Sequence, residues 1–159
     1  MIPLPEWHPI AVHFPLALTV TGTLALSAAR VAPPERHGAT LAVVGTWNLC
    51  LGALGALLAL GTGLAAVATL ELAPMARAAV GLHVKWAIFT TSALALLAVW
   101  RGAGTDPASR PSRAFLVVLW AVTAALIVTA YRGGQNVYRY GVGVTPSAEL
   151  GQHFGGERS

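Results

Sequence analysis

The chain has 159 residues, of which 55% are hydrophobic and only 10% are charged. Its mean hydropathy of +0.65 is too high for a chain that folds in water, which excludes an ordinary soluble domain. The net charge is +4, but the ten basic residues lie mostly between apolar runs, so we expect no nucleic-acid partner. The single cysteine, Cys50, can neither close an internal disulfide nor form a paired-thiolate metal site.

Four apolar runs are long enough to cross a membrane, since a helix needs about 20 residues to span a hydrocarbon core about 30 Å thick. They cover residues 9–29, 39–70, 78–100 and 113–131. The second run exceeds one crossing, so we expect it to tilt, to extend past the bilayer or to break near residues 61–63. These runs predict an all-α, integral membrane four-helix bundle over residues 1–144, with a flexible tail over 145–159.

The placement of basic residues bears on targeting and topology. No Lys or Arg precedes Arg30, so the first run lacks the basic flank of a secretory signal and is expected to be retained. Four crossings place both chain ends on one side. On the side of the chain ends, Lys85 lies within a predicted helix and Arg158 lies far from one, so we leave both out of the comparison. The remaining Lys and Arg residues are then more numerous on the opposite side, which favours that side as cytoplasmic. We therefore expect a multi-pass protein of the bacterial inner membrane with periplasmic termini.

Two histidines inside the spans are the main candidates for function, because ionisable groups in a membrane are costly and usually functional. His13 and His83 lie about one turn into the first and third helices, which start from the same side. Imidazoles at matched depth on two helices suit a haem iron, with one nitrogen above the metal and one below. The sequence thus favours haem b held by His13 and His83. The alternative is that each ring only bonds a carbonyl of a neighbouring helix.

Other residues are placed in the sequence where they could complete this predicted haem site. Aromatic residues that could line the slot are Phe14, Trp86 and Phe89, and donors for the haem propionates are Lys85, Arg132, Tyr138 and Arg139. A second possibility is a copper or zinc site formed by His13 and His83 with His8. His8 and His13 are five residues apart and point in different directions on a regular helix, although Pro9 and Pro15 distort that turn.

Two terminal motifs carry a family resemblance. Residues 8–15 read HPIAVHFP and residues 133–144 read GGQNVYRYGVGV; Thr62-Gly63 and the lone His83 lie between them. The chain resembles a family of predicted bacterial membrane proteins, domain of unknown function 2231. The resemblance implies a four-helix membrane domain associated with redox modules. The family's usual closing pattern has Glu-Leu where this chain has Gln135-Asn136, and a histidine where it has Tyr140, so a second metal centre is not expected here.

The glycine-rich end of the chain has a physical interpretation of its own. Glycines at 133, 134, 141 and 143 permit positive φ and close backbone approach, so residues 132–144 are predicted to fold as a loop. That loop would either cover the cofactor as a lid or simply cap the fourth helix.

The leading functional hypothesis is a b-type haem protein that carries electrons between quinol and a redox partner. One alternative is a structural or assembly subunit that packs through small residues such as Gly52 and Gly55 against a larger membrane complex or in a homo-oligomer. Another is a metal-binding or transport protein that uses the histidines and Glu71. No catalytic triad, phosphate loop or zinc-protease motif occurs, so independent catalytic activity is not expected.

Overall fold

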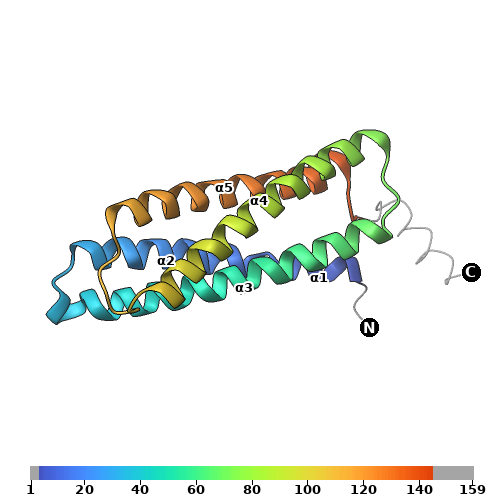
Figure 1. Ribbon diagram of the computed structural model, residues 1–159. Coiled ribbons are helices and arrows are strands. Elements are labelled where there is room, and N and C mark those ends of the chain that lie inside the picture. Colours follow the sequence, from blue (N-terminus) through green and yellow to red (C-terminus); the bar gives the residue numbers. More distant parts are fainter. Residues whose placement is uncertain (1–3, 145–159) are drawn as a thin grey trace, which may run out of the picture.

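The structure, a computed structural model, describes residues 4–144 and is built from long helices (Figure 1). The elements are α1 (Leu4–Ala11), α2 (His13–Val31), the π-helical turn η1 (Pro34–Gly38), α3 (Ala39–Thr69), α4 (Pro74–Gly104) and α5 (Arg113–Tyr140). Four stretches of helix are long and apolar enough to cross a membrane: Trp7–Val31, Pro34–Thr69, Pro74–Gly104 and Arg113–Tyr140. The predicted all-α membrane bundle is confirmed.

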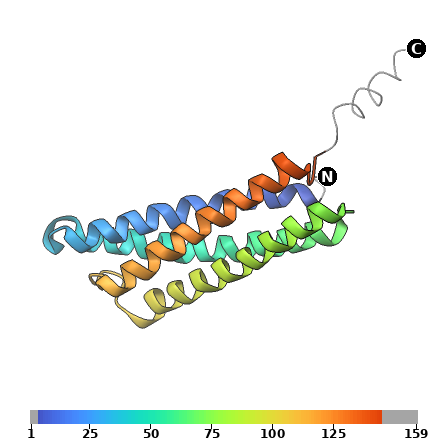
Figure 2. The ribbon, with the colours of Figure 1, turned by 90° about the horizontal axis from the view of Figure 1, so that it is seen from above.

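The four spans run up and down in chain order (Figures 1 and 2). The span made of α1 and α2 packs along α3, α3 packs on α4, α4 on α5, and α5 returns to α2. Short links allow this arrangement, because consecutive helices become antiparallel neighbours. Residues 4 and 144 consequently lie near the same end of the bundle, which we call the histidine end.

The break in a span occurs in the first one, and the second is continuous. α3 runs unbroken for 31 residues, about 46 Å at 1.5 Å per residue, so it is longer than a hydrocarbon core. The first span is interrupted at Val12, between α1 and α2. Pro15 explains the break, because it cannot donate to the carbonyl four residues earlier and its ring crowds that carbonyl. Both halves of this span nevertheless pack along α3.

Glycines let α2 and α3 approach closely. A Cβ added at Gly45 would lie 2.6 Å from Cγ of Leu26, and one added at Gly52 would lie 2.9 Å from Oγ1 of Thr19. Both distances are below a van der Waals contact, so only glycine fits. Gly55 packs in the same way on Pro15. The small-residue face of α3 is thus used inside the chain.

Arg101 holds the end of the bundle opposite the histidines. Its side chain is 3% exposed and donates to the hydroxyls of Thr46, Thr105 and Ser109 and to the carbonyls of Pro107 and Ser109. The planar guanidinium has five N–H groups, so one side chain can satisfy this many acceptors. The link between α4 and α5 is thereby fixed to α3.

The bundle is solid in one half and hollow in the other. The apolar core is formed by Leu26, Leu49, Ala53, Ala56, Leu94, Leu97, Ala98, Phe115, Leu119 and Val122. α3 and α4 touch in this half, where the thiol of Cys50 lies 3.8 Å from the carbonyl oxygen of Ala98. Towards Pro74, α4 moves away from α3 (Figure 1). The space that opens at the histidine end contains the candidate site.

Candidate functional site

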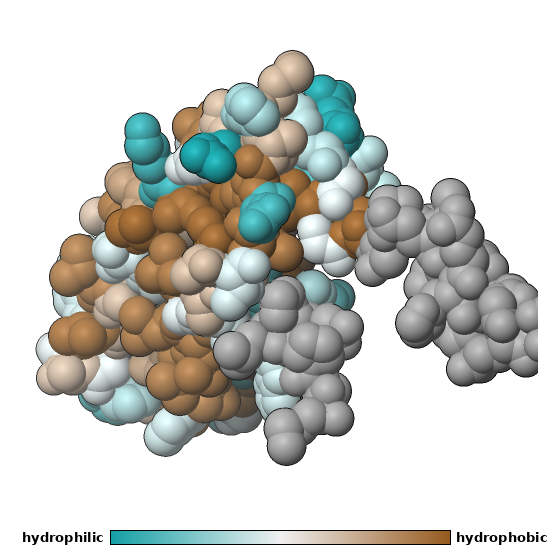
Figure 3. Space-filling model, turned by 90° about the vertical axis from the view of Figure 1, so that its right-hand side faces the viewer, coloured by the Kyte–Doolittle hydropathy of each residue, from teal (hydrophilic) through white to brown (hydrophobic). Residues whose placement is uncertain are grey.

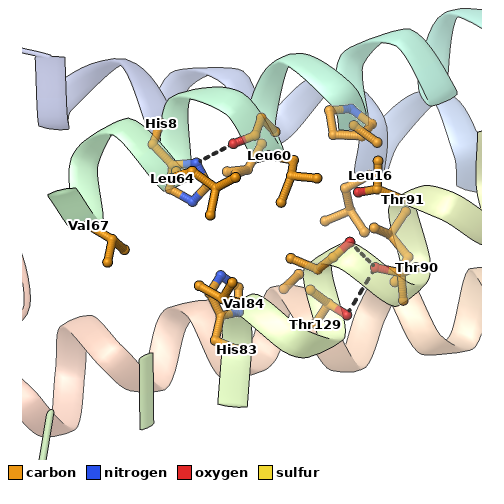
Figure 4. A pocket seen from close by; sticks show the side chains of 18 residues that line it. His8, Leu16, Leu60, Leu64, Val67, His83, Val84, Thr90, Thr91 and Thr129 are labelled. Carbon is orange, nitrogen blue, oxygen red and sulfur yellow. Dashed lines mark hydrogen bonds between the residues drawn. The ribbon is translucent and has the colours of Figure 1, made fainter. Parts of the chain in front are cut away.

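A cavity of about 90 Å³ lies between the helices in the hollow half of the bundle. Aliphatic side chains of α2, α3 and α4 form most of its wall, and the hydroxyl-bearing Thr90, Thr91 and Thr129 close its inner end. The imidazoles of His8 and His83 point into the cavity from opposite sides (Figure 4). Two imidazoles therefore face one apolar space.

His8 is oriented by a backbone carbonyl of α3. Its Nδ1 lies 2.9 Å from the carbonyl oxygen of Ala59. A carbonyl oxygen only accepts hydrogen bonds, so Nδ1 carries the hydrogen and Nε2 keeps its lone pair. Histidines that bind metals are commonly held this way, with one nitrogen donating to a carbonyl and the other left for the metal.

His83 reaches the cavity from α4 and has an unsatisfied nitrogen. Its Nδ1 is buried and has no hydrogen-bond partner in the described part of the chain. The ring as a whole is not without a polar neighbour, because it makes a hydrogen bond with the backbone of Thr129 on α5. A buried polar atom without a partner is unusual and calls for an explanation such as a missing ligand.

Two glycines provide the space that the imidazoles occupy. A Cβ added at Gly63 would lie 2.9 Å from Cε1 of His8, and one added at Gly133 would lie 3.1 Å from Cε1 of His83. Each histidine thus rests on a glycine of a different helix, Gly63 of α3 and Gly133 of α5. These close approaches give both glycine motifs a function in positioning the rings.

A second cavity of about 330 Å³ continues towards the histidine end. It shares His8, Gly63, Val67 and His83 with the first cavity. Val142, Gly143 and Val144 also line it, so the segment after α5 lies over the site.

The predicted loop over residues 132–144 is wrong in its extent, because α5 continues to Tyr140. The helix ends at Gly141, whose φ of +63° is left-handed and whose N–H donates to the carbonyl of Val137. Only residues 141–144 leave the helix within this predicted loop. The predicted tail over residues 145–159 lies outside the described residues.

The structure does not bring the predicted pair His13 and His83 together. His13 is exposed and lines neither of the cavities that contain His83. The reason is the rotation along the first span, where a five-residue separation turns side chains by about 140° on a helix. His8 takes the place opposite His83.

Most other residues assigned to the haem slot point elsewhere. Phe14 is 61% exposed and Phe89 63% exposed, and Tyr138 is 92% exposed. Lys85 and Arg139 are exposed as well, and none of these five residues lines either histidine cavity.

Trp86 and Arg132 contact each other beside the site, with the guanidinium carbon 5.4 Å from the ring centroid. Neither residue lines the histidine cavities. The walls facing the imidazoles are aliphatic where aromatic rings were expected.

The alternative site of three histidines is not formed. Across residues 4–144, no three His, Cys, Asp or Glu side chains gather closely enough to hold a metal ion. Glu71 is exposed and does not line the histidine cavities. Protein zinc sites use three or four protein ligands, whereas here two imidazoles face each other.

Sequence reasoning missed the carbonyl of Ala59 and the space-making role of Gly63 and Gly133. The carbonyl leaves no trace in the sequence, because every residue has one. The glycines left a signal, because both lie in the motifs that carry the family resemblance. Each is, however, far along the chain from the histidine that it contacts. Their pairing with particular rings required the three-dimensional structure.

Comparison with curated proteins and with solved structures finds no match for this chain. A family profile described as predicted membrane protein, DUF2231, matches residues 4–146 and so covers both histidines of the site and both terminal motifs. The chain therefore belongs to the DUF2231 family of predicted membrane proteins.

Proposed function

We propose that this chain is a membrane haem protein of the b type, in which His8 and His83 would hold the haem iron. In this proposal it transfers electrons between a quinol and a redox partner and has no independent catalytic activity. The observation that carries the proposal is the pair of imidazoles facing one apolar cavity, the first fixed on a carbonyl and the second with a buried, unpartnered nitrogen.

The donor set fits haem better than a bare metal ion. A porphyrin supplies four nitrogens of its own, so two histidines complete six-coordinate iron. A zinc ion would need at least one more protein ligand, and the described residues offer no such cluster. Two facing imidazoles are therefore sufficient for haem and insufficient for a typical zinc site.

The available space also bears on the cofactor. The first cavity, about 90 Å³, equals roughly three waters at about 30 Å³ each, which is less than a porphyrin needs. The adjoining cavity of about 330 Å³ extends the space along His8 and His83 to the segment 141–144. Binding therefore requires aliphatic side chains between the two cavities to rotate.

Bound haem would supply one-electron chemistry, and the surrounding residues would tune it. The Ala59 carbonyl would fix the orientation and tautomer of the His8 imidazole by accepting its hydrogen. Aliphatic walls exclude water and keep the local dielectric constant low, which influences the reduction potential. Gly63 and Gly133 keep the rings in register for a shared ligand.

The membrane setting extends the proposal. The chain would reside in the bacterial inner membrane with the histidine end facing the periplasm, as the distribution of basic residues favours. Electrons would then pass from quinol in the bilayer to a partner on the periplasmic side. The scaffold alternative is weakened, because Gly52 and Gly55 pack against α2 within the chain.

An absorption spectrum tests the proposal. The full-length protein is purified in detergent and titrated with haem, and the spectrum is recorded before and after reduction. We expect saturable binding, a sharpened Soret band and the narrow α band of low-spin iron on reduction, and reduction by a water-soluble quinol analogue. Absence of saturable binding would overturn the haem proposal, and copper binding in its place would favour the metal-ion alternative.

A further inference from the structure

A separate groove of about 390 Å³ lies between α4 and α5 at the histidine end. One wall is polar and comes from α5, with Arg132, Gln135, Asn136 and Tyr140 on one helical face. The other wall is apolar and comes from the first turns of α4: Met75, Ala78, Ala79 and Leu82. At this end of the molecule, hydrophilic groups stand in separate clusters on a mainly hydrophobic surface (Figure 3).

The polar wall is positively charged and contains no carboxylate. The Nε of Arg132 is buried without a hydrogen-bond partner, and the guanidinium rests on the ring of Trp86 at 5.4 Å. Stacking on an aromatic ring fixes the plane of a guanidinium and leaves its edge available for bidentate binding. An oxyanion is the natural complement of such an edge.

Other groups of the groove suit the same anion. Asn136 is 6% exposed and lines the groove, so its carboxamide is held in place. Gln135 and Tyr140 add an amide and a phenol that can donate to phosphate oxygens. The N-terminal turns of α4 contribute the positive end of a helix dipole on the opposite wall.

The apolar wall indicates that the anion belongs to a lipid. Met75 is 76% exposed and Leu82 is 44% exposed, which leaves an apolar track running from the polar wall along the outer surface of α4. A free phosphate ion would gain nothing from this track, whereas an acyl chain would cover it. Basic pockets between membrane helices bind anionic lipid headgroups by this combination.

We propose that the groove between α4 and α5 binds an anionic phospholipid, with Arg132 holding the phosphate and the first turns of α4 contacting an acyl chain. The groove shares Asn136 with the second histidine cavity, but neither His8 nor His83 lines the groove, so its ligand would be held by other groups than those of the proposed haem site. The two proposals can therefore fail separately.

Native mass spectrometry of the full-length protein in detergent tests the site, with phosphatidylglycerol and phosphatidylcholine as probes. We expect phosphatidylglycerol to be retained at least about tenfold more strongly, and Arg132→Gln to remove this preference. Arg139→Gln is the matched control, since Arg139 is an exposed arginine of the same helix outside the groove. Ala78→Phe, which fills the groove without changing charge, should also reduce retention.

Several outcomes would overturn the lipid proposal. One is equal retention of phosphatidylglycerol and phosphatidylcholine. Another is an equal loss of phosphatidylglycerol retention in Arg132→Gln and Arg139→Gln. Displacement of phosphatidylglycerol by equimolar inorganic phosphate would indicate a free-anion site. Loss of haem binding in Arg132→Gln with unchanged lipid retention would assign the guanidinium to a haem propionate. If Arg132→Gln does not fold, as judged by circular dichroism, unchanged retention in Ala78→Phe refutes the proposal.

Discussion

Replacing Gly63 by alanine should weaken cofactor binding through His8. The added Cβ would lie 2.9 Å from Cε1 and 3.0 Å from Nδ1 of the ring, whereas carbon atoms normally approach to about 3.5–4.0 Å. The ring must therefore move by roughly half an ångström, which stretches its 2.9 Å hydrogen bond to Ala59 beyond the usual range. Overpacking of this kind costs about 1–3 kcal/mol. Because bound iron would hold the ring in place, haem affinity should fall about 5- to 150-fold.

The assay is a haem titration followed at the Soret band, with Gly61→Ala as the control. A Cβ at Gly61 meets nothing within 4 Å, so this variant carries the same helix-propensity gain, about 1 kcal/mol, without the collision. The control should bind haem like the unmodified chain. Equal affinities in Gly63→Ala and Gly61→Ala would refute the role assigned to this glycine.

Three more predictions follow from the described contacts. Gly133→Ala should weaken haem binding several-fold through His83, whereas Gly134→Ala, whose Cβ meets nothing within 4 Å, should not; equal titrations would contradict this. Arg101→Lys should lower the free energy of unfolding in detergent by about 3 kcal/mol, because an ammonium has only three N–H groups for the five acceptors. An unchanged denaturation midpoint would show that other contacts hold the link between α4 and α5. Thr23→Val should remove the 2.8 Å hydroxyl pair with Thr123 and cost about 0.6–1.7 kcal/mol in the same unfolding assay. The comparison is the exposed Thr69→Val, since the Thr69 hydroxyl bonds the Ala66 carbonyl of its own helix.

The fold was largely predictable because hydropathy and length determine membrane spans. The sequence-based spans were too short at the fourth helix, which was ended at Tyr131 but continues to Tyr140. The polar and glycine residues of this segment look like a loop by composition, yet the segment is helical and buries Asn136. The long second run was expected to tilt, to extend past the bilayer or to break near residues 61–63. It is continuous, and the interruption lies in the first span, where Pro15 disrupts the helix at Val12.

The candidate site was only half predictable. Depth along a helix can be counted from the sequence, so His83 was found, but which face of the first span turns towards the bundle could not be. His13 was preferred because its depth in the first helix matches that of His83 in the third, and the structure gives the facing position to His8. The rings are positioned by the backbone carbonyl of Ala59 and by Gly63 and Gly133. Which ring each of these contacts depends on tertiary packing.

Alanine variants of three histidines test whether His8 and His83 together hold one haem. His8→Ala, His83→Ala and His13→Ala are purified in full length and compared by the low-spin spectrum of the oxidised and reduced protein with added haem. We predict that His8→Ala and His83→Ala each lose the low-spin spectrum, while His13→Ala retains it. Retention in His8→Ala together with loss in His13→Ala would contradict the account.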